Sequence, residues 1–164
     1  MKSKTTRKLA MAGVFTALAV VGSMLSVPIA SSKCAPVQHM INILSAVLLG
    51  PGYGIAFVAS LLRNILGLGS FLAFPGSMVG ALCCGLVYKY TKKVFPTCFA
   101  EAFGTGILGG IAAYPVAKYA MGVPDIGVFV YVLPFLISTV AGSVLAFILV
   151  AALKKSGVTE FFEN

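Results

Sequence analysis

Long apolar runs, separated by short breaks rich in glycine, proline or polar residues, dominate this chain. The uncharged runs cover residues 9–30, 34–62, 64–88, 102–117 and 126–153. A membrane-spanning helix needs about 20 apolar residues, so several of these runs are long enough to cross a bilayer. The runs lack the alternation of apolar and polar residues that is typical of a membrane barrel strand, and they therefore predict helices.

The breaks divide these runs into six predicted helices in one membrane domain. Pro28 stops the first run, the dense cluster Gly50-Pro51-Gly52 turns the chain, and Pro75 suits a first helical turn. We expect an all-α integral membrane protein, a single domain over residues 1–164. Its helices are expected over residues 8–27, 38–49, 54–66, 75–90, 97–119 and 128–154.

The second and third predicted helices are short for a full crossing, since a dozen residues rise only about 18 Å. They either cross with irregular ends or form a re-entrant hairpin. Both choices return the chain to the same side. The first run, at about 22 residues, has the length of a span rather than of a signal peptide, and we expect it to be retained as a true helix.

Composition excludes a water-facing surface, and charge sets the orientation. Of 164 residues, 59% are hydrophobic and 10% are charged, whereas a soluble domain has about 25% charged residues. The net charge of +8 predicts no nucleic-acid partner, because the basic residues gather at helix ends that six crossings place together. By the positive-inside rule, both termini are expected inside a bacterial cytoplasmic membrane. The basic residues at the helix ends that are expected inside are Lys2, Lys4, Arg7, Lys8, Lys89, Lys92, Lys93, Lys154 and Lys155.

The sequence offers little for catalysis or metal binding. Its four cysteines and single histidine lack metal-ligand spacing, and its four acidic residues form no catalytic pair. We place Glu101 near the inner end of the fifth helix and Asp125 in an outer loop, so the acids that a membrane hydrolase or proton-coupled pump requires are missing. We expect no enzyme activity, no cofactor and no metal.

Polar and aromatic side chains fall at a common depth in the outer half of the predicted helices, where a polar group is costly unless it is paired or wet. They predict one pocket open to the outside, roofed by the loops at 29–37, 67–74 and 122–125. Aromatic rings could stack on a small planar heterocycle while amides and basic groups bind its edge. The candidate substrate-binding residues are His39, Asn42, Arg63, Asn64, Phe71, Phe74, Ser77, Tyr114, Lys118 and Tyr131.

Each candidate has an alternative structural role. Arg63 could extend to the membrane surface or pair with Asp125, and Lys118 could be an interfacial anchor. His39 and Asn42 could satisfy the broken backbone between the second and third helices. The candidate tyrosines could belong to the interfacial aromatic belt.

The first helix resembles that of the S components of energy-coupling-factor (ECF) transporters. Residues 7–19, RKLAMAGVFTALA, carry the resemblance, and Gly13 and Ala17 match the small residues that in this family pack against the transmembrane coupling subunit. Gly13 stands where alanine is usual, a change that is conservative in size. Gly13 and Ala17 are therefore the candidate partner-interface residues.

Four central motifs are more specific, and they resemble the thiazole-type S component, ThiW. They are QHMINIL at 38–44, LLGPGYG at 48–54, SLLRNILG at 60–67 and LAFPGSMVGA at 72–81. The resemblance implies a six-helix protein that binds the thiamin precursor hydroxyethylthiazole outside. It also implies a transmembrane coupling subunit and two cytoplasmic ATPases as partners, and the lipid bilayer as the surroundings of the chain.

Two alternatives stay open. The chain could serve another thiamin-related precursor or vitamin, because pocket shape decides the substrate. It could instead be a structural subunit of a membrane complex, in which the small residues spaced four apart are the whole function.

Overall fold

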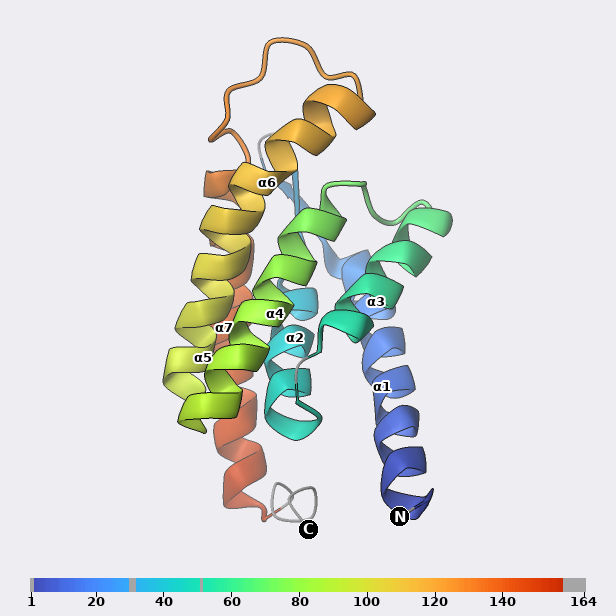
Figure 1. The fold of residues 1–164 in the computed structure, drawn as a ribbon, viewed down its shortest axis with the longest axis vertical. Helices are drawn as coiled ribbons and strands as arrows, with labels where there is room; N and C mark the ends of the chain where they lie inside the picture. The colour runs from blue at the N-terminus through green and yellow to red at the C-terminus, as the bar shows by residue number, and fades with distance from the viewer. Residues whose placement is uncertain (1, 30–31, 51, 158–164) are drawn as a thin grey trace.

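The computed structural model describes residues 2–29, 32–50 and 52–157, which form a mostly helical bundle (Figure 1). The first residues of the chain and the last turn of its final helix lie at the same end of the bundle, here called the terminal end. A short two-stranded hairpin lies toward the opposite end, here called the hairpin end. The helical class expected from the apolar runs is confirmed.

The chain begins with helix α1 (Lys2–Gly22) and a 3₁₀ turn, η1 (Ser23–Leu25), and then forms the hairpin. Strand β1 (Val27–Ile29) pairs antiparallel with β2 (Ser32–Cys34), in a register that sets Val27 opposite Cys34. We expected a loop here. The β-branched Val27 and Ile29 favour extended backbone, and the Ala35 amide donates a 2.9 Å hydrogen bond to Ser138 Oγ, which ties the hairpin to the last helix.

Helix α2 (Pro36–Leu48) is central, and it packs against α1, α4 and α7. Pro36 lies in its first turn, where the missing amide hydrogen is not needed. The turn after α2 uses Gly50 at a φ of +99°, a left-handed conformation that favours glycine. Helix α3 (Tyr53–Ile65) then rises beside α1 and α4.

Helix α4 (Ala73–Thr91) ends at Lys92, whose φ is +54°, and a long helical stretch follows over Val94–Ala120. This stretch contains wider, π-helical turns, and the last helix, α7, covers Val132–Lys155. The parts of the long stretch are α5 (Val94–Glu101), the π-helical η2 (Ala102–Gly109), α6 (Gly110–Pro115) and the π-helical η3 (Val116–Ala120).

Glycines let α4 and η2 approach with their backbones in contact. A Cβ atom built on Gly109 would lie 2.7 Å from the Cα of Gly76, and one built on Gly104 would lie 3.0 Å from the Cα of Gly80. Lipid gives no hydrophobic force between helices, so close backbone packing of this kind holds them together.

Three helices in the described part of the chain are long and apolar enough to cross a membrane: Thr5–Leu25, Val94–Ala120 and Val132–Lys155. Pro36–Leu48 and Gly54–Ile65 are apolar but shorter. The outward faces of the spans carry large apolar side chains, such as Leu18 and Ile148, which are exposed in the protein and suit contact with lipid.

Candidate functional site

A pocket with about 470 Å³ of empty volume lies toward the hairpin end. Strand β2, the segment between α3 and α4, and the helices α2, α3, α4, η2 and α7 all contribute to its lining. Both polar and apolar side chains line it, as is typical of small-molecule sites. The lining residues are Ser32, Lys33, Ala35, Gln38, His39, Arg63, Gly69, Ser70, Leu72, Ala73, Gly76, Ser77, Thr105, Phe135 and Ser138.

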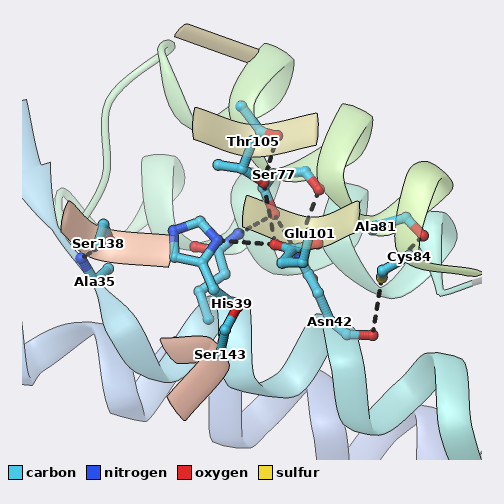
Figure 2. Close-up of polar contacts among 12 residues, drawn as sticks. Ala35, His39, Asn42, Ser77, Ala81, Cys84, Glu101, Thr105, Ser138 and Ser143 are labelled. Carbon is cyan, nitrogen blue, oxygen red and sulfur yellow. Dashed lines mark hydrogen bonds and ion pairs between the residues drawn. The ribbon is translucent and has the colours of Figure 1, made fainter. Parts of the chain in front are cut away.

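A buried hydrogen-bond network centred on Glu101 joins the pocket to the interior of the bundle (Figure 2). The Nδ1 of His39 lies 3.0 Å from Glu101 Oε1, within hydrogen-bond distance, and the Asn42 side-chain amide donates to the same oxygen at 2.9 Å. The Thr105 hydroxyl lies 3.1 Å from that oxygen and 3.2 Å from the carbonyl oxygen of Gly76. The second carboxylate oxygen of Glu101 has no hydrogen-bond partner among the described residues.

Glu101, which was predicted near the inner end of the fifth helix, is fully buried within the bundle, at 0% exposure. Its Oε1 atom lies 3.0 Å from His39 Nδ1, 62 residues earlier in the chain. The alternative in which His39 and Asn42 satisfy broken backbone after α2 is incorrect, because their side chains bind Glu101 instead. A buried carboxylate is stable only with such donors.

Gln38 forms a second polar link on the pocket side of α2. Its side-chain amide donates to the hydroxyls of Ser77 on α4 and Ser60 on α3. Asn42 adds a 3.3 Å hydrogen bond to the carbonyl oxygen of Ser77. The two links, through Gln38 and through Glu101, hold α2, α3, α4 and the long helical stretch together around the pocket.

Helix geometry explains why Glu101 and Thr105 bind one another and the same partners. They lie four residues apart at the junction of α5 and η2, so both project toward α2 and α4. Gly80 provides the space, because a Cβ atom at this position would collide with the Thr105 hydroxyl and the Glu101 carboxylate. π-helical turns such as those of η2 occur frequently at functional sites.

Arg63 is buried at 4% exposure and lines the pocket. Its side chain stays inside the protein, and it forms no ion pair with Asp125, although both side chains are described. The segment after α3 folds back over it, since the amides of Leu68 and Gly69 both donate to the carbonyl oxygen of Arg63. Its Nε atom has no hydrogen-bond partner in the described part of the chain.

A family model described as thiamine-precursor transporter protein (ThiW) matches residues 9–156. The chain belongs to the ThiW family. It is therefore a membrane transport protein for thiamin precursors, and not an enzyme. No curated protein and no solved structure shows significant similarity to it.

Three of the ten predicted site residues of this ThiW protein line the pocket: His39, Arg63 and Ser77. Asn42 lies beneath it in the Glu101 network. Asn64 holds the segment that forms the rim, because its side-chain amide donates to the carbonyl oxygens of Ser60 and Ser70 at 2.8 and 3.1 Å.

Five of the predicted site residues, Phe71, Phe74, Tyr114, Lys118 and Tyr131, do not line the pocket. Phe71 is exposed at 58%, and Phe74 packs against Phe57 with ring centroids 5.7 Å apart. Lys118 is exposed and donates to the Tyr114 hydroxyl at 3.1 Å.

Tyr131 is buried beside Phe135, with ring centroids 6.2 Å apart, in an apolar cluster with Leu72. Phe135, rather than Tyr131, is the aromatic residue that lines the pocket.

Sequence reasoning missed several lining residues. Gln38 and Thr105 are polar residues inside apolar runs, the signal that selected Asn42, and they could have been found in the same way. The lining residues Leu72, Ala73 and Phe135 could not be found from the sequence, because apolar residues are common along the whole chain. Among the described residues, no group of three His, Cys, Asp or Glu side chains could hold a metal ion.

The predicted partner-interface residues of this ThiW protein lie on an open face of α1. Gly13 and Ala17 are both exposed, and a Cβ atom on Gly13 would meet no atom within 4 Å. Gly13 borders a mainly apolar groove between α1 and α3, together with Ala12, Thr16, Ile55 and Val58.

Proposed function

We propose that this ThiW protein is the substrate-binding subunit of an ECF-type ABC importer, and that it captures hydroxyethylthiazole from outside the cell. The observation that carries the proposal is the pocket near the hairpin end, where buried polar side chains from α2, α3 and α4 face one aromatic ring on α7. A small planar heterocycle with one polar substituent matches that combination.

The pocket offers different surfaces to the two parts of such a ligand. Phe135 and Leu72 supply apolar area for the thiazole ring, and offset stacking on an aromatic ring adds about 1 kcal/mol to its burial. Gln38, His39 and Ser138 supply hydrogen-bonding groups for the ring nitrogen and the hydroxyl. Ser77 and Arg63 complete the proposed contacts.

The remaining predicted residues are proposed to act indirectly. Asn42 orients the Glu101 network beneath the ligand, and Asn64 fixes the rim. Tyr131 supports Phe135 from behind. Phe71, Phe74, Tyr114 and Lys118 do not line the pocket, and their contribution to binding is proposed to be the smallest.

Charge supports an orientation with the pocket outside. The basic ends of α4 and α7, which carry Lys89 and Lys154, lie at the terminal end together with the basic start of α1 (Figure 1). Positive residues favour the cytoplasmic side, so we propose a multi-pass protein of the bacterial cytoplasmic membrane with both termini inside.

The open face of α1 is the proposed contact with the coupling subunit. Gly13 and Ala17 leave space for a partner helix to approach closely, and lipid would otherwise cover this face. Two cytoplasmic ATPases would act through that coupling subunit.

Calorimetric titration of the detergent-purified chain tests the proposal. We expect tight binding of hydroxyethylthiazole and much weaker binding of thiamin and the pyrimidine precursor. Replacing Phe135 with alanine should weaken binding about tenfold or more, because stacking and burial are both lost. The matched control is Phe99→Ala, an exposed ring on α5 that does not line the pocket, and it should leave the affinity unchanged.

Tight binding of thiamin or the pyrimidine instead would keep the transport role and correct the substrate. No binding of any of the three by folded protein would contradict the proposal and favour a structural subunit.

A further inference from the structure

We infer that the pocket selects a ligand bearing an oxyanion group, a phosphate or a carboxylate, which pairs with Arg63. The inference rests on the proposed function, because it assigns a charge to the thiamin precursor that the pocket takes. It starts from a buried positive charge that forms no ion pair with the acidic side chains the structure describes.

Arg63 is almost completely buried, and its Nε donor is unpaired among the described residues. An arginine carries its charge under all physiological conditions, and burying such a charge without a partner is costly. Two acidic side chains are described, and neither forms an ion pair with Arg63. Glu101 pairs with His39, and Asp125 is exposed between η3 and α7 without an ion pair to Arg63.

Glu101 is not part of the pocket lining, and its Oε1 atom already lies within hydrogen-bond distance of His39, Asn42 and Thr105. Lys33, exposed on β2, is a second cation in the lining. The described lining therefore carries two positive charges, and no acidic side chain is part of it.

The helix that carries Arg63 offsets only part of this charge. Arg63 lies in the last turn of α3, where the helix dipole presents about half a negative charge. Some of that partial charge is already used, because the amides of Leu68 and Gly69 donate to the Arg63 carbonyl oxygen. A guanidinium instead offers paired donors that match the two oxygens of a carboxylate or phosphate.

The sequence supports a specific role for these two cations. Nine of the twelve basic residues follow the positive-inside pattern, and the three that do not are Lys33, Arg63 and Lys118. Two of those three line the pocket. A site for a neutral alcohol needs no cation, whereas a site for an anionic form of the precursor gains affinity from each.

The test compares three ligands with one thiazole skeleton by calorimetric titration: hydroxyethylthiazole, its phosphate ester, and the acetate obtained when the alcohol is oxidised. At least one anionic ligand should bind the wild-type protein about tenfold or more tightly than the alcohol. The phosphate and the acetate distinguish the two possible oxyanions. Equal or tighter binding of the alcohol than of both anions would overturn the inference while leaving the proposed function intact.

Variants locate the effect. Arg63→Gln should weaken binding of the preferred anion about 10- to 100-fold and binding of the alcohol much less, and Lys33→Gln should show the same preference with a smaller loss. Lys93→Gln, which removes one exposed charge at the terminal end, is the control. If Arg63→Gln fails to fold, the ligand preference of the wild-type protein and the affinities of Lys33→Gln still test the inference. Equal losses for anion and alcohol in both variants, or no binding of any thiazole, would contradict the inference.

Discussion

Two pairs of small residues with the same spacing have opposite environments in this protein. Gly76 and Gly80 on α4 are buried against η2, whereas Gly13 and Ala17 on α1 are exposed. Both pairs are spaced four residues apart, so each forms a flat strip on one helix face. The same pattern thus marks a closed internal contact in one place and an open face in the other.

The difference lies in what surrounds each pair. Beside Gly80, the Glu101 and Thr105 side chains pack close to the α4 backbone, where Glu101 binds Asn42 of α2. A side chain at position 80 would collide with both groups. Around Gly13, α1 carries no buried polar network, and its span is only 28% buried. Small residues alone therefore do not indicate a partner; an open face is also required.

The largest expected effect comes from Gly80→Leu. The new side chain collides with Thr105 and Glu101 and separates α4 from η2, so overpacking and loss of the buried network together should cost more than about 4 kcal/mol. Size-exclusion chromatography and thermal unfolding in detergent should show little folded protein. Near wild-type stability would mean that α4 and η2 do not pack in this way.

Glu101→Leu comes next. It leaves His39 and Asn42 buried without their acceptor, which should cost about 3–5 kcal/mol in chemical denaturation experiments. Glu101→Gln is the control, since it keeps the shape and one acceptor oxygen, and it should lose less. If the two substitutions cost the same, the hydrogen-bond network would not be the source of the stability.

Asn64→Ala should have a smaller effect. Two hydrogen bonds to the carbonyl oxygens of Ser60 and Ser70 are lost, which corresponds to about 1–2 kcal/mol. Because Ser70 lines the pocket, ligand binding should weaken a few-fold, and its dissociation should accelerate. Calorimetry together with stopped-flow measurements checks both. An unchanged dissociation rate would show that the rim does not retain the ligand.

Gly13→Leu should change stability and ligand affinity least, because nothing in the described protein lies near that position. It should nevertheless prevent copurification with the coupling subunit if the open face of α1 is the contact. If Gly13→Leu unfolds the chain as Gly80→Leu does, the difference between an open face at Gly13 and a closed contact at Gly80 is contradicted. If the variant still assembles with the coupling subunit, the partner contact does not lie at this face of α1.

The fold followed from the sequence where the signal was local. The predicted signals Gly50 and Pro75 lie close to the ends of observed helices, because hydropathy and backbone conformation act within a few residues. The short β1–β2 hairpin was not predicted. Its strands are only three residues long, and its anchor to Ser138 joins positions 103 residues apart.

The site was harder to predict, because it depends on contacts between distant residues. Glu101 was predicted near a helix end. Its contact with His39 on α2 was not predicted, because the two residues lie 62 positions apart in the chain. The sequence could not show whether the Arg63 side chain lines a pocket or reaches the surface. The chain reversal at Leu68 and Gly69, whose amides donate to the carbonyl oxygen of Arg63, places it in the pocket lining. Among the polar residues of α2, His39 was predicted to line a pocket and does so, but no local pattern showed which side chains these residues would contact.

The most direct measurement is a structure of the protein with hydroxyethylthiazole, or its preferred anionic form, bound. We predict that the ring lies against Phe135, that its polar edge faces Gln38 and His39, and that its substituent points to Arg63. A ligand bound instead among Phe71, Tyr114 and Lys118, with the pocket empty, would contradict the proposed site.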